Sequence, residues 1–523
     1  MGCTESIPPG TPEYIRLDPQ QAAQIADSLE EAIQPKLADG LEIKLWASDS
    51  LLADPVAIDI DNQGNIYATR THRQKNSEFD IRGHRDWMTA SISLQSVEDR
   101  RDFLRAEFAS ERSDSNQWLP DLNGDTLHDW QDLAVQQEEV YRLWDESGDG
   151  VADVAQLFVR DFQTEVTDVA GGLMVHDDDV YLAVAPDLWK LQDRNGDGIA
   201  DKQESLSHGY QTHIGFGGHG MSGITMGPDG RIYWGIGDIG FNVVDKTGKR
   251  WEYPNQGAIL RCNPDGSDFE VFAAGLRNTH EFVFDDYGNI ISEDNDGDHP
   301  GESERLVYIT QGSDAGWRTN WQFGKYTDPD NNLYKVWMDE ELYLPRHENT
   351  PAYIIPPIRN YRDGPTGMIY NPGTAVSPKY KNHFFVVSFR GAASRSPIYA
   401  FTLKPDGAGF AFEDDEVVME GGILPTGIRI GPDGAMYIAD WIDGWGTKNY
   451  GRIWRLDDPE AAQSELRKQT EALVKADFAD KGPEELKDLL AFEDKRVRQK
   501  AQFALAKRGA KSLALFQQAS KDN

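Results

Sequence analysis

Cysteine, positive charge and long apolar runs are all scarce in this sequence. Its 523 residues include 2 cysteines, Cys3 and Cys262, which cannot build a framework of disulfides. Lys and Arg number 52 against 88 Asp and Glu, and the net charge of -36 argues against nucleic-acid partners and against electrostatic binding to anionic lipids. No uninterrupted apolar stretch approaches the ~18 residues of a membrane span. A hydrophobic content of 39%, with 11% aromatic residues, excludes a disordered chain.

A recurring phrase is the clearest architectural signal. Each copy runs from apolar residues through a turn, usually with Gly and Asp or Pro, to an apolar residue beside an aromatic one, most clearly at residues 224–233 and 428–437. This pattern is typical of a β-hairpin. Six copies end at Tyr67, Tyr181, Tyr233, Ile290, Phe384 and Tyr437. Most gaps between them are close to the roughly 40 to 50 residues of a propeller blade, and the longer gaps leave room for insertions. The sequence therefore predicts an all-β fold, a six-bladed β-propeller, with generic hairpins as the alternative.

Three domains are predicted. Residues 1–40 form a lead segment with a lipoprotein linker and a helix, residues 41–457 form the propeller, and residues 458–523 form a helical extension. Glycine becomes scarce after residue 457, and residues 486–506 resemble one HEAT repeat. A single repeat cannot bury its own apolar face. Either these helices pack on the propeller, or they begin a longer solenoid.

The propeller carries an insertion at about residues 74–140. Residues 96–105 are charged and helical in period, and residues 130–143 have the same period, so both segments are predicted to be helices. A second insertion, residues 312–360, is rich in Trp, Tyr and Pro and has no clear periodicity. Loops of this kind cover propeller faces and often carry function.

One acidic loop has the spacing of a calcium site. The oxygen-bearing residues at positions 1, 3, 5, 9 and 12 of an EF-hand loop would be Asp193, Asn195, Asp197, Asp201 and Glu204. No EF-hand helices flank this loop, because residues 188–191 have the pattern of a strand. An Asx-rich hairpin turn that binds no ion is an equally strong interpretation.

A second acidic loop is denser. Glu293, Asp294, Asp296 and Asp298 lie within six residues, and their charges repel one another unless a cation compensates. Hard oxygen ligands on a glycine-containing loop suit calcium better than zinc. We predict a calcium site here, with a solvated acidic turn as the alternative.

His219 is the candidate catalytic base. It lies among glycines just before a predicted hairpin that should return Asp238 close to it. A carboxylate beside an imidazole fixes its tautomer and supports general-base catalysis, although a lone histidine is often structural. Arg277 with Asn278, and Arg390, lie at predicted strand ends among small residues. Each could be an ordinary surface or ion-pair residue. Alternatively, the guanidinium groups of Arg277 and Arg390 lie buried at the propeller centre, where they would suit a carboxylated ligand.

The segment from His219 to Asp238 resembles the active-site blade of the soluble sugar dehydrogenases that depend on pyrroloquinoline quinone (PQQ). In that family a histidine base precedes a Gly-Pro-Asp turn and an Ile-Gly-Asp sequence, and the same order occurs here without a gap. The resemblance implies a six-bladed propeller that binds PQQ and calcium and oxidises a small-molecule sugar or other alcohol. It implies that His219 takes the hydroxyl proton, Asp238 orients His219, and Arg390 stabilises developing negative charge and contacts the cofactor. Arg277 and Asn278 resemble the pair that holds the quinone in that family.

This sequence also departs from the sugar dehydrogenases. A lysine contacts the quinone from the fifth blade in that family, and its nearest equivalent here is Asn371, although Lys379 and Lys381 lie close by. We therefore take Asn371 as a cofactor-binding candidate. The departure favours an alternative function, a non-catalytic propeller that binds a glycan or a partner protein and uses calcium structurally. A calcium-dependent lactonase or other hydrolase is a third interpretation.

A closer resemblance is to the large membrane-bound dehydrogenase propellers of planctomycetes and related bacteria. It covers roughly residues 41–456 and is clearest at residues 45–59, 294–304, 316–318 and 440–453. Many of these proteins continue into HEAT repeats and a cytochrome c domain with a Cys-x-x-Cys-His motif, which does not occur here. The resemblance implies that electrons pass to a cytochrome c or a similar acceptor, on a separate protein or on a portion outside this sequence.

The first residues allow three interpretations. Gly2-Cys3 matches the cleavage site of a bacterial lipoprotein signal, Met-Gly-x-x-x-Ser fits N-myristoylation, and a plain cytosolic start is the third. The resemblance favours the first. We expect an exported bacterial protein, periplasmic or anchored in the outer membrane through a lipid on Cys3.

Overall fold

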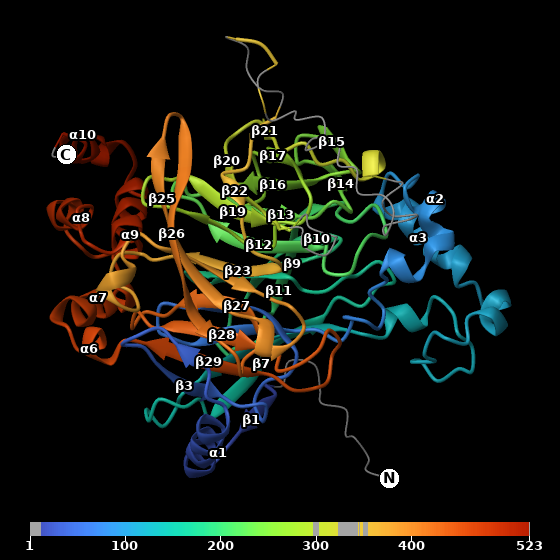
Figure 1. Cartoon of the computed structure of the whole chain (residues 1–523), viewed down its shortest axis with the longest axis horizontal. Helices are drawn as coiled ribbons and strands as arrows, with labels where there is room; N and C mark the ends of the chain where they lie inside the picture. Colours follow the sequence, from blue (N-terminus) through green and yellow to red (C-terminus); the bar gives the residue numbers. More distant parts are fainter. Residues whose placement is uncertain (1–11, 296–302, 323–343, 345, 349–353, 522–523) are drawn as a thin grey trace.

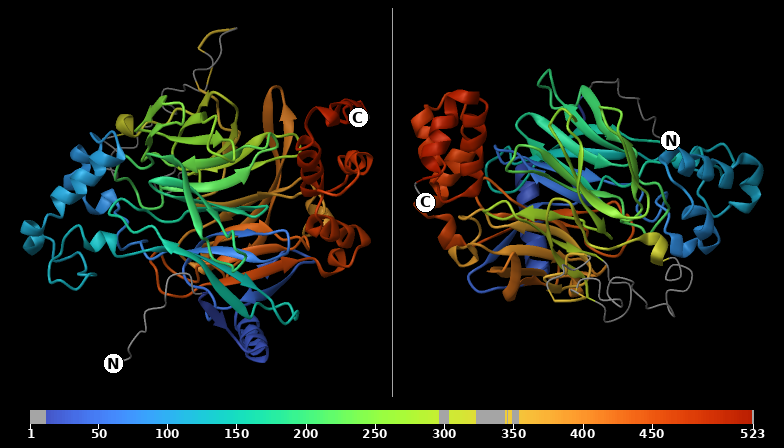
Figure 2. Two further views of the ribbon diagram at one scale, coloured as in Figure 1. Left: turned by 180° about the vertical axis from the view of Figure 1, so that it is seen from behind. Right: turned by 90° about the horizontal axis from the view of Figure 1, so that it is seen from above.

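Six sheets of four or five strands are arranged around a common centre in the computed structural model (Figures 1 and 2). The structure describes residues 12–295, 303–322, 344, 346–348 and 354–521. Strands are given from inner to outer, and the first sheet consists of β4 (Pro55–Ile60), β5 (Ile66–Arg70), β6 (Glu138–Trp144), β7 (Val154–Asp161) and β1 (Tyr14–Arg16). The second sheet consists of β8 (Gly172–His176), β9 (Asp179–Val184), β10 (Asp187–Gln192) and β11 (Lys202–His208). The third sheet consists of β12 (Met221–Met226), β13 (Ile232–Ile236), β16 (Gly257–Cys262), β17 (Glu270–Leu276) and β21 (Ser313–Asp314). The fourth sheet consists of β18 (Phe282–Phe284), β19 (Ile290–Asp294), β20 (Arg305–Ile309) and β22 (Arg359–Asn360). The fifth sheet consists of β23 (Pro365–Tyr370), β24 (Phe384–Ser388), β25 (Ile398–Asp406), β26 (Gly409–Glu420) and β2 (Lys36–Leu37). The sixth sheet consists of β27 (Pro425–Ile430), β28 (Met436–Asp440), β29 (Arg452–Asp457) and β3 (Glu42–Ala47). The predicted six-bladed β-propeller is confirmed.

Each copy of the recurring phrase forms the two inner strands of one blade. In β12 and β13, for example, Ile224 pairs with Trp234 in an antiparallel ladder whose apolar side chains are buried. The turn between these strands contains Gly230, whose φ of 77° lies in the region that other residues rarely adopt. Periodicity and turn chemistry therefore define the same hairpins.

The ring of blades is closed by strands from both ends of the propeller sequence. β3 pairs with β29, with Ala47 opposite Ile453, so an N-terminal strand completes the last blade. Apolar side chains fill the space between neighbouring blades. Trp46 of β3 and Tyr437 of β28, both in the last blade and with ring centroids 5.8 Å apart, share an apolar cluster with Ile66 of the first blade. A small hairpin, β14 (Phe241–Val244) with β15 (Arg250–Tyr253), forms a separate sheet between β13 and β16 of the sequence.

The first insertion contains short helices that lie beside the propeller (Figure 1). They are η1 (Ile81–Gly83), η2 (Arg85–Trp87), α2 (Met88–Ser91), α3 (Val97–Glu107), η3 (Ser110–Ser115) and η4 (Asp132–Ala134). Trp87, Phe108 and Leu133 share an apolar cluster with Ile214 and Phe216 of the propeller. The insertion is thereby anchored next to the loop that leads to His219.

One helix prediction in this insertion is wrong. Residues 138–144 form strand β6 rather than the end of a helix over 130–143. β6 pairs with β5 on one side and β7 on the other, so ladder hydrogen bonds on both edges outweigh the helical period of this segment.

The C-terminal helices pack on the propeller, on the side away from the insertion (Figures 1 and 2). They are α6 (Pro459–Ala462), α7 (Glu465–Lys475), α8 (Pro483–Leu489), α9 (Lys495–Ala506), η8 (Gly509–Ser512) and α10 (Leu513–Ala519). Arg467 is buried and donates to Asp457, with Nη2 2.9 Å from Oδ2, and Gln502 donates to the carbonyl of Pro228 at 2.6 Å. The other helices of the described residues are α1 (Pro19–Ala32), η5 (Thr319–Gln322), η6 (Pro378–Tyr380) and η7 (Ala393–Arg395). Within the described residues, no helix combines the length and the apolar character needed to cross a bilayer.

Candidate active site

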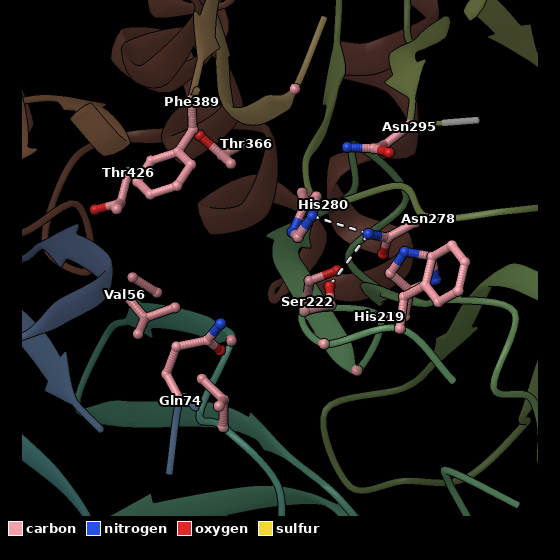
Figure 3. A pocket seen from close by; sticks show the side chains of 18 of the residues that line it. Val56, Gln74, His219, Ser222, Asn278, His280, Asn295, Thr366, Phe389 and Thr426 are labelled. Atoms are coloured by element: carbon pink, nitrogen blue, oxygen red, sulfur yellow. Dashed lines mark hydrogen bonds between the residues drawn. The ribbon is translucent and has the colours of Figure 1, made fainter. Parts of the chain in front are cut away.

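A cavity of about 630 Å³ lies at the centre of the ring, where the inner strands begin (Figure 3). All six blades contribute to its lining, for example through Val56 of β4, Ser222 of β12, Thr366 of β23 and Thr426 of β27. Because the blades converge here, residues from distant parts of the sequence face one space. The cavity is therefore the place to look for the candidate site residues.

His219 and Asp238 form a buried pair beside this cavity. The hairpin β12–β13 brings Nδ1 of His219 to 2.7 Å from Oδ1 of Asp238, and both side chains are at most 5% exposed. Oδ2 of Asp238 accepts from Trp317 Nε1 at 2.8 Å and from Thr319 Oγ1 at 3.1 Å. A carboxylate held by these donors requires the imidazole proton on Nδ1, which makes Nε2 the basic atom of His219.

Arg277 and Asn278 follow strand β17 and line the same cavity. Their backbone N–H groups both donate to Oδ1 of Asp294, at 3.0 and 2.9 Å, so this carboxylate fixes the course of the chain. The guanidinium of Arg277 is buried, lies over the rings of Phe216 and Trp317, and donates to Asn295. The two residues are thus brought to the side of the cavity that holds His219.

Arg390 reaches the cavity from the fifth blade, whereas Asn371 does not. Nε of Arg390 donates to Ser388 Oγ at 3.0 Å, and its side chain is 34% exposed. Asn371 follows the last residue of β23, roughly 16 Å along the strand from Thr366 at its cavity end. Its amide closes a local turn by accepting from Gly373 N and donating to Ala375 O. The run of β23 thus separates Asn371 from the other candidate cofactor-binding residues.

The first acidic loop closes on itself. Asp193 accepts from the N–H groups of Gly196 and Gly198, each at 2.7 Å, and Asp197 accepts from Ile199 N at 2.9 Å. The other three candidate ligands have different partners: Asn195 bonds to Asp197, Asp201 accepts from Arg194 N, and Glu204 pairs with Lys202. This is the hydrogen bonding of an Asx turn, and the structure does not gather the five side chains around one point.

The second acidic loop lies only partly within the described residues. Oδ2 of Asp294 accepts from Arg305 at 2.7 Å, so both of its oxygens are occupied by protein donors. Oε1 of Glu293 accepts from Arg362 N at 2.6 Å, and Asp296 and Asp298 lie outside the described residues. Across the described part of the chain, no group of three or more His, Cys, Asp or Glu side chains could hold a metal ion. The described residues thus form no calcium site, the ligand set with Asp296 and Asp298 stays a prediction, and no catalytic step is assigned to calcium.

Comparison with known families identifies the chain. The family model named Domain of unknown function (DUF7133) matches residues 28–445. The chain belongs to the DUF7133 family. No curated protein has a matching sequence.

Solved structures resemble this DUF7133 protein only distantly. An oxidoreductase described as a glucose dehydrogenase, from Thermus thermophilus, is 15% identical, with 80% of this chain and 99% of that chain covered and a TM-score of 0.45. The PQQ-bound aldose sugar dehydrogenase of Streptomyces coelicolor is 14% identical, with 81% and 100% covered and a TM-score of 0.44. The PQQ domain of a pyranose dehydrogenase from Coprinopsis cinerea is 11% identical, with 81% and 97% covered and a TM-score of 0.44.

The DUF7133 cavity also contains two carboxyl groups that no motif indicated. Glu78 accepts a hydrogen bond from the N–H of Gly218, the residue before His219, and Asp168 lies against Gly220, the residue after it. Burial, with the neighbouring Asp168 carboxyl adding to it, raises the pKa of Glu78 well above its usual value, and burial also raises the pKa of Asp168. Glu78 lies in the insertion and Asp168 precedes β8, so sequence spacing offers no signal that they meet at His219.

Proposed function

We propose that this DUF7133 protein is a PQQ-dependent dehydrogenase that oxidises a hydroxyl group of a sugar or another alcohol. The observation that carries the proposal is the His219–Asp238 hydrogen bond of 2.7 Å beside a cavity of about 630 Å³. A buried imidazole oriented by a carboxylate is the arrangement that removes a proton from a weakly acidic hydroxyl group.

The lining of the cavity suits a carboxylated quinone. Among the described residues, five with cationic side chains line it, Lys75, Arg82, Arg277, Arg390 and Arg429, together with five that carry carboxyl groups, Glu78, Asp168, Glu281, Glu304 and Asp363. Guanidinium groups bind carboxylates through paired hydrogen bonds, so Arg277 and Arg390, on different blades, would hold a flat, carboxylated ring between them. When bound, PQQ would supply the acceptor for the hydride that leaves the alcohol carbon.

The chain's own residues would handle the proton. Nε2 of His219 would take the hydroxyl proton, and Asp238 would stabilise the resulting imidazolium through its hydrogen bond to Nδ1. The Arg390 guanidinium would stabilise negative charge that develops in the cavity. Trp317 and Thr319 keep Asp238 in place, which preserves the tautomer of His219 throughout the cycle.

Titration of the purified protein with PQQ, followed by calorimetry and absorbance, tests the proposal. We expect saturable binding that Arg390→Gln weakens, while Lys404→Gln, at an exposed cation of the same blade outside the cavity lining, leaves it unchanged. With an artificial dye as acceptor, His219→Ala should lose sugar oxidation while it keeps its fold by circular dichroism. The proposed dehydrogenase function would be overturned if no quinone bound at high micromolar concentration, or if His219→Ala kept full activity.

A non-catalytic glycan-binding propeller is the second candidate, and one observation favours it. Trp445 lines the cavity, yet it is 55% exposed, and Phe389 packs edge-to-face against it with centroids 5.0 Å apart. An exposed indole at the rim of a cavity suits the apolar face of a sugar ring. Glycan binding without turnover by the quinone-treated protein would select this candidate.

Two further features belong to the proposal. Electrons would leave to a cytochrome c or a similar acceptor protein, and an exported form would be anchored through a lipid on Cys3. Reduction of added cytochrome c by the substrate-treated protein tests the electron acceptor. Cys3 lies outside the described residues, and mass spectrometry of the protein from its native membranes tests the lipid.

A further inference from the structure

A second histidine faces the cavity next to His219. His280 precedes β18 and lines the cavity together with His219 and Asn278. Figure 3 shows its ring between the amide of Asn278 and the open centre of the cavity. Nothing in the sequence singled out this residue.

The hydrogen bonds around Asn278 fix the tautomer of His280. Nδ2 of Asn278 lies 3.1 Å from the carbonyl oxygen of Gly218, which can only accept, so the amide nitrogen is the atom at this position. The same nitrogen lies 2.9 Å from Nε2 of His280. Its second N–H therefore donates to Nε2, and the proton of a neutral His280 must be on Nδ1. Among the described residues, Nδ1 of His280 has no hydrogen-bond partner.

The same contacts change the role of Asn278. Both hydrogens of its amide nitrogen are used within the protein, by Gly218 and by His280. Its Oδ1 is buried and has no partner in the described part of the chain. Asn278 therefore has no amide hydrogen left for a molecule in the cavity, and it acts as a positioning residue for His280.

The surroundings of His280 keep it neutral. Burial, helped by positive charge on His219 and Arg277 and opposed by the Asp294 carboxylate, lowers the pKa of His280 to about 4. An imidazole in this state donates one hydrogen bond and carries no charge at neutral pH.

We infer that His280 donates a hydrogen bond from Nδ1 to an oxygen atom of the molecule that occupies the cavity. The two histidines would then share one tautomer, with the proton on Nδ1, but play opposite roles: His219 accepts a proton at Nε2 and His280 donates a hydrogen bond from Nδ1. The inference rests on the proposed function, because that function names the two oxygens in question. One is a carbonyl oxygen of the quinone, and the other is an oxygen of the sugar.

Two variants of His280 test the donor. His280→Phe keeps a planar ring and removes the donor, whereas His280→Asn places an amide nitrogen near the position of Nδ1. We expect His280→Phe to lower the affinity for one of the two ligands about tenfold, which is the usual effect of losing one buried hydrogen bond. His280→Asn should restore part of this affinity. Weaker PQQ binding by calorimetry would assign the oxygen to the quinone. A higher KM or Kd for the sugar, with unchanged PQQ affinity, would assign it to the substrate.

A spectroscopic measurement tests the tautomer without turnover. The ¹⁵N signals of His280, identified by their loss in His280→Phe, should show protonation at Nδ1 in the wild type. Asn278→Asp should reverse this pattern, because a carboxylate accepts where the amide donates. Protonation at Nε2 in the wild type, or equal affinities of wild type and His280→Phe for both ligands, would overturn the inference. If PQQ failed to bind but His280→Phe still weakened sugar binding to the quinone-free protein, the proposed function would be overturned and the inference about His280 would stand.

Discussion

The carboxyl group of Glu78 accepts a hydrogen bond from the backbone N–H of Gly218. This contact ties the insertion to the residue that precedes the catalytic candidate. Asp168 lies against Gly220 on the other side, so two carboxyl groups from distant segments bracket the peptide that carries His219. Neither contact lies within a blade, which makes the position of His219 depend on how the insertion packs on the propeller.

The first prediction concerns the orientation of His219. Asp238→Asn should lower kcat by about 10²- to 10⁴-fold, because an amide no longer stabilises the imidazolium and can impose the other tautomer. Its affinity for PQQ should stay close to that of the wild type, since Asp238 does not line the cavity. Dye-linked activity and calorimetry measure the two quantities, and an unchanged kcat would remove Asp238 from the mechanism.

The second prediction concerns Gly220. A Cβ at this position would overlap Oδ2 of Asp168 and crowd Nε2 of Gln211, so Gly220→Ala should cost about 1–3 kcal/mol of unfolding free energy and shift His219. Gly83→Ala is the matched control, because no atom lies within 4 Å of the Cβ it would introduce. Urea unfolding of both variants measures the effect, and equal stabilities would contradict the close packing.

The third prediction concerns the pH dependence of stability. Burial raises the pKa of Glu138 to about 8, against an ordinary value of 4.5, although Arg73 opposes the shift. The unfolded chain loses this proton first as pH rises, so the stability contributed by neutral Glu138 is present below pH 4.5 and is lost progressively as pH approaches 8. Glu138→Gln should therefore gain stability relative to the wild type as pH rises through this window.

The matched control for this effect is Glu252→Gln, at an exposed carboxylate. Its stability difference from the wild type should be flat over the same pH range. Denaturant unfolding at several pH values gives both curves, and parallel curves for Glu138→Gln and the wild type would show that Glu138 is ionised in the folded protein.

The fourth prediction concerns the rim of the cavity. Trp445→Ala should raise the KM or Kd for a sugar about threefold to tenfold, because the exposed indole would stack on the sugar ring. Tyr287→Ala, at another exposed aromatic residue outside the cavity lining, should have no effect. An effect of Trp445→Ala on KM or Kd that is no larger than that of Tyr287→Ala would exclude a role for this rim in sugar binding.

Sequence patterns by themselves determined the architecture and one contact of the site. Alternating apolar residues around glycine turns are local features, and they repeat with the spacing of blades, so the six hairpins follow from the chain directly. His219 and Asp238 flank a single hairpin, and antiparallel pairing of its two strands is enough to bring them together.

Tertiary structure decided the rest, because the remaining contacts join segments with no shared local pattern. Glu78 and Asp168 meet at His219 only when the insertion and two blades are in place. The direction of β23 sends Asn371 away from the cavity, and ladder pairing on both edges turns a helical period into β6. The donor role of His280 depends on the direction of one amide group, which hydrogen-bond geometry sets and residue spacing does not.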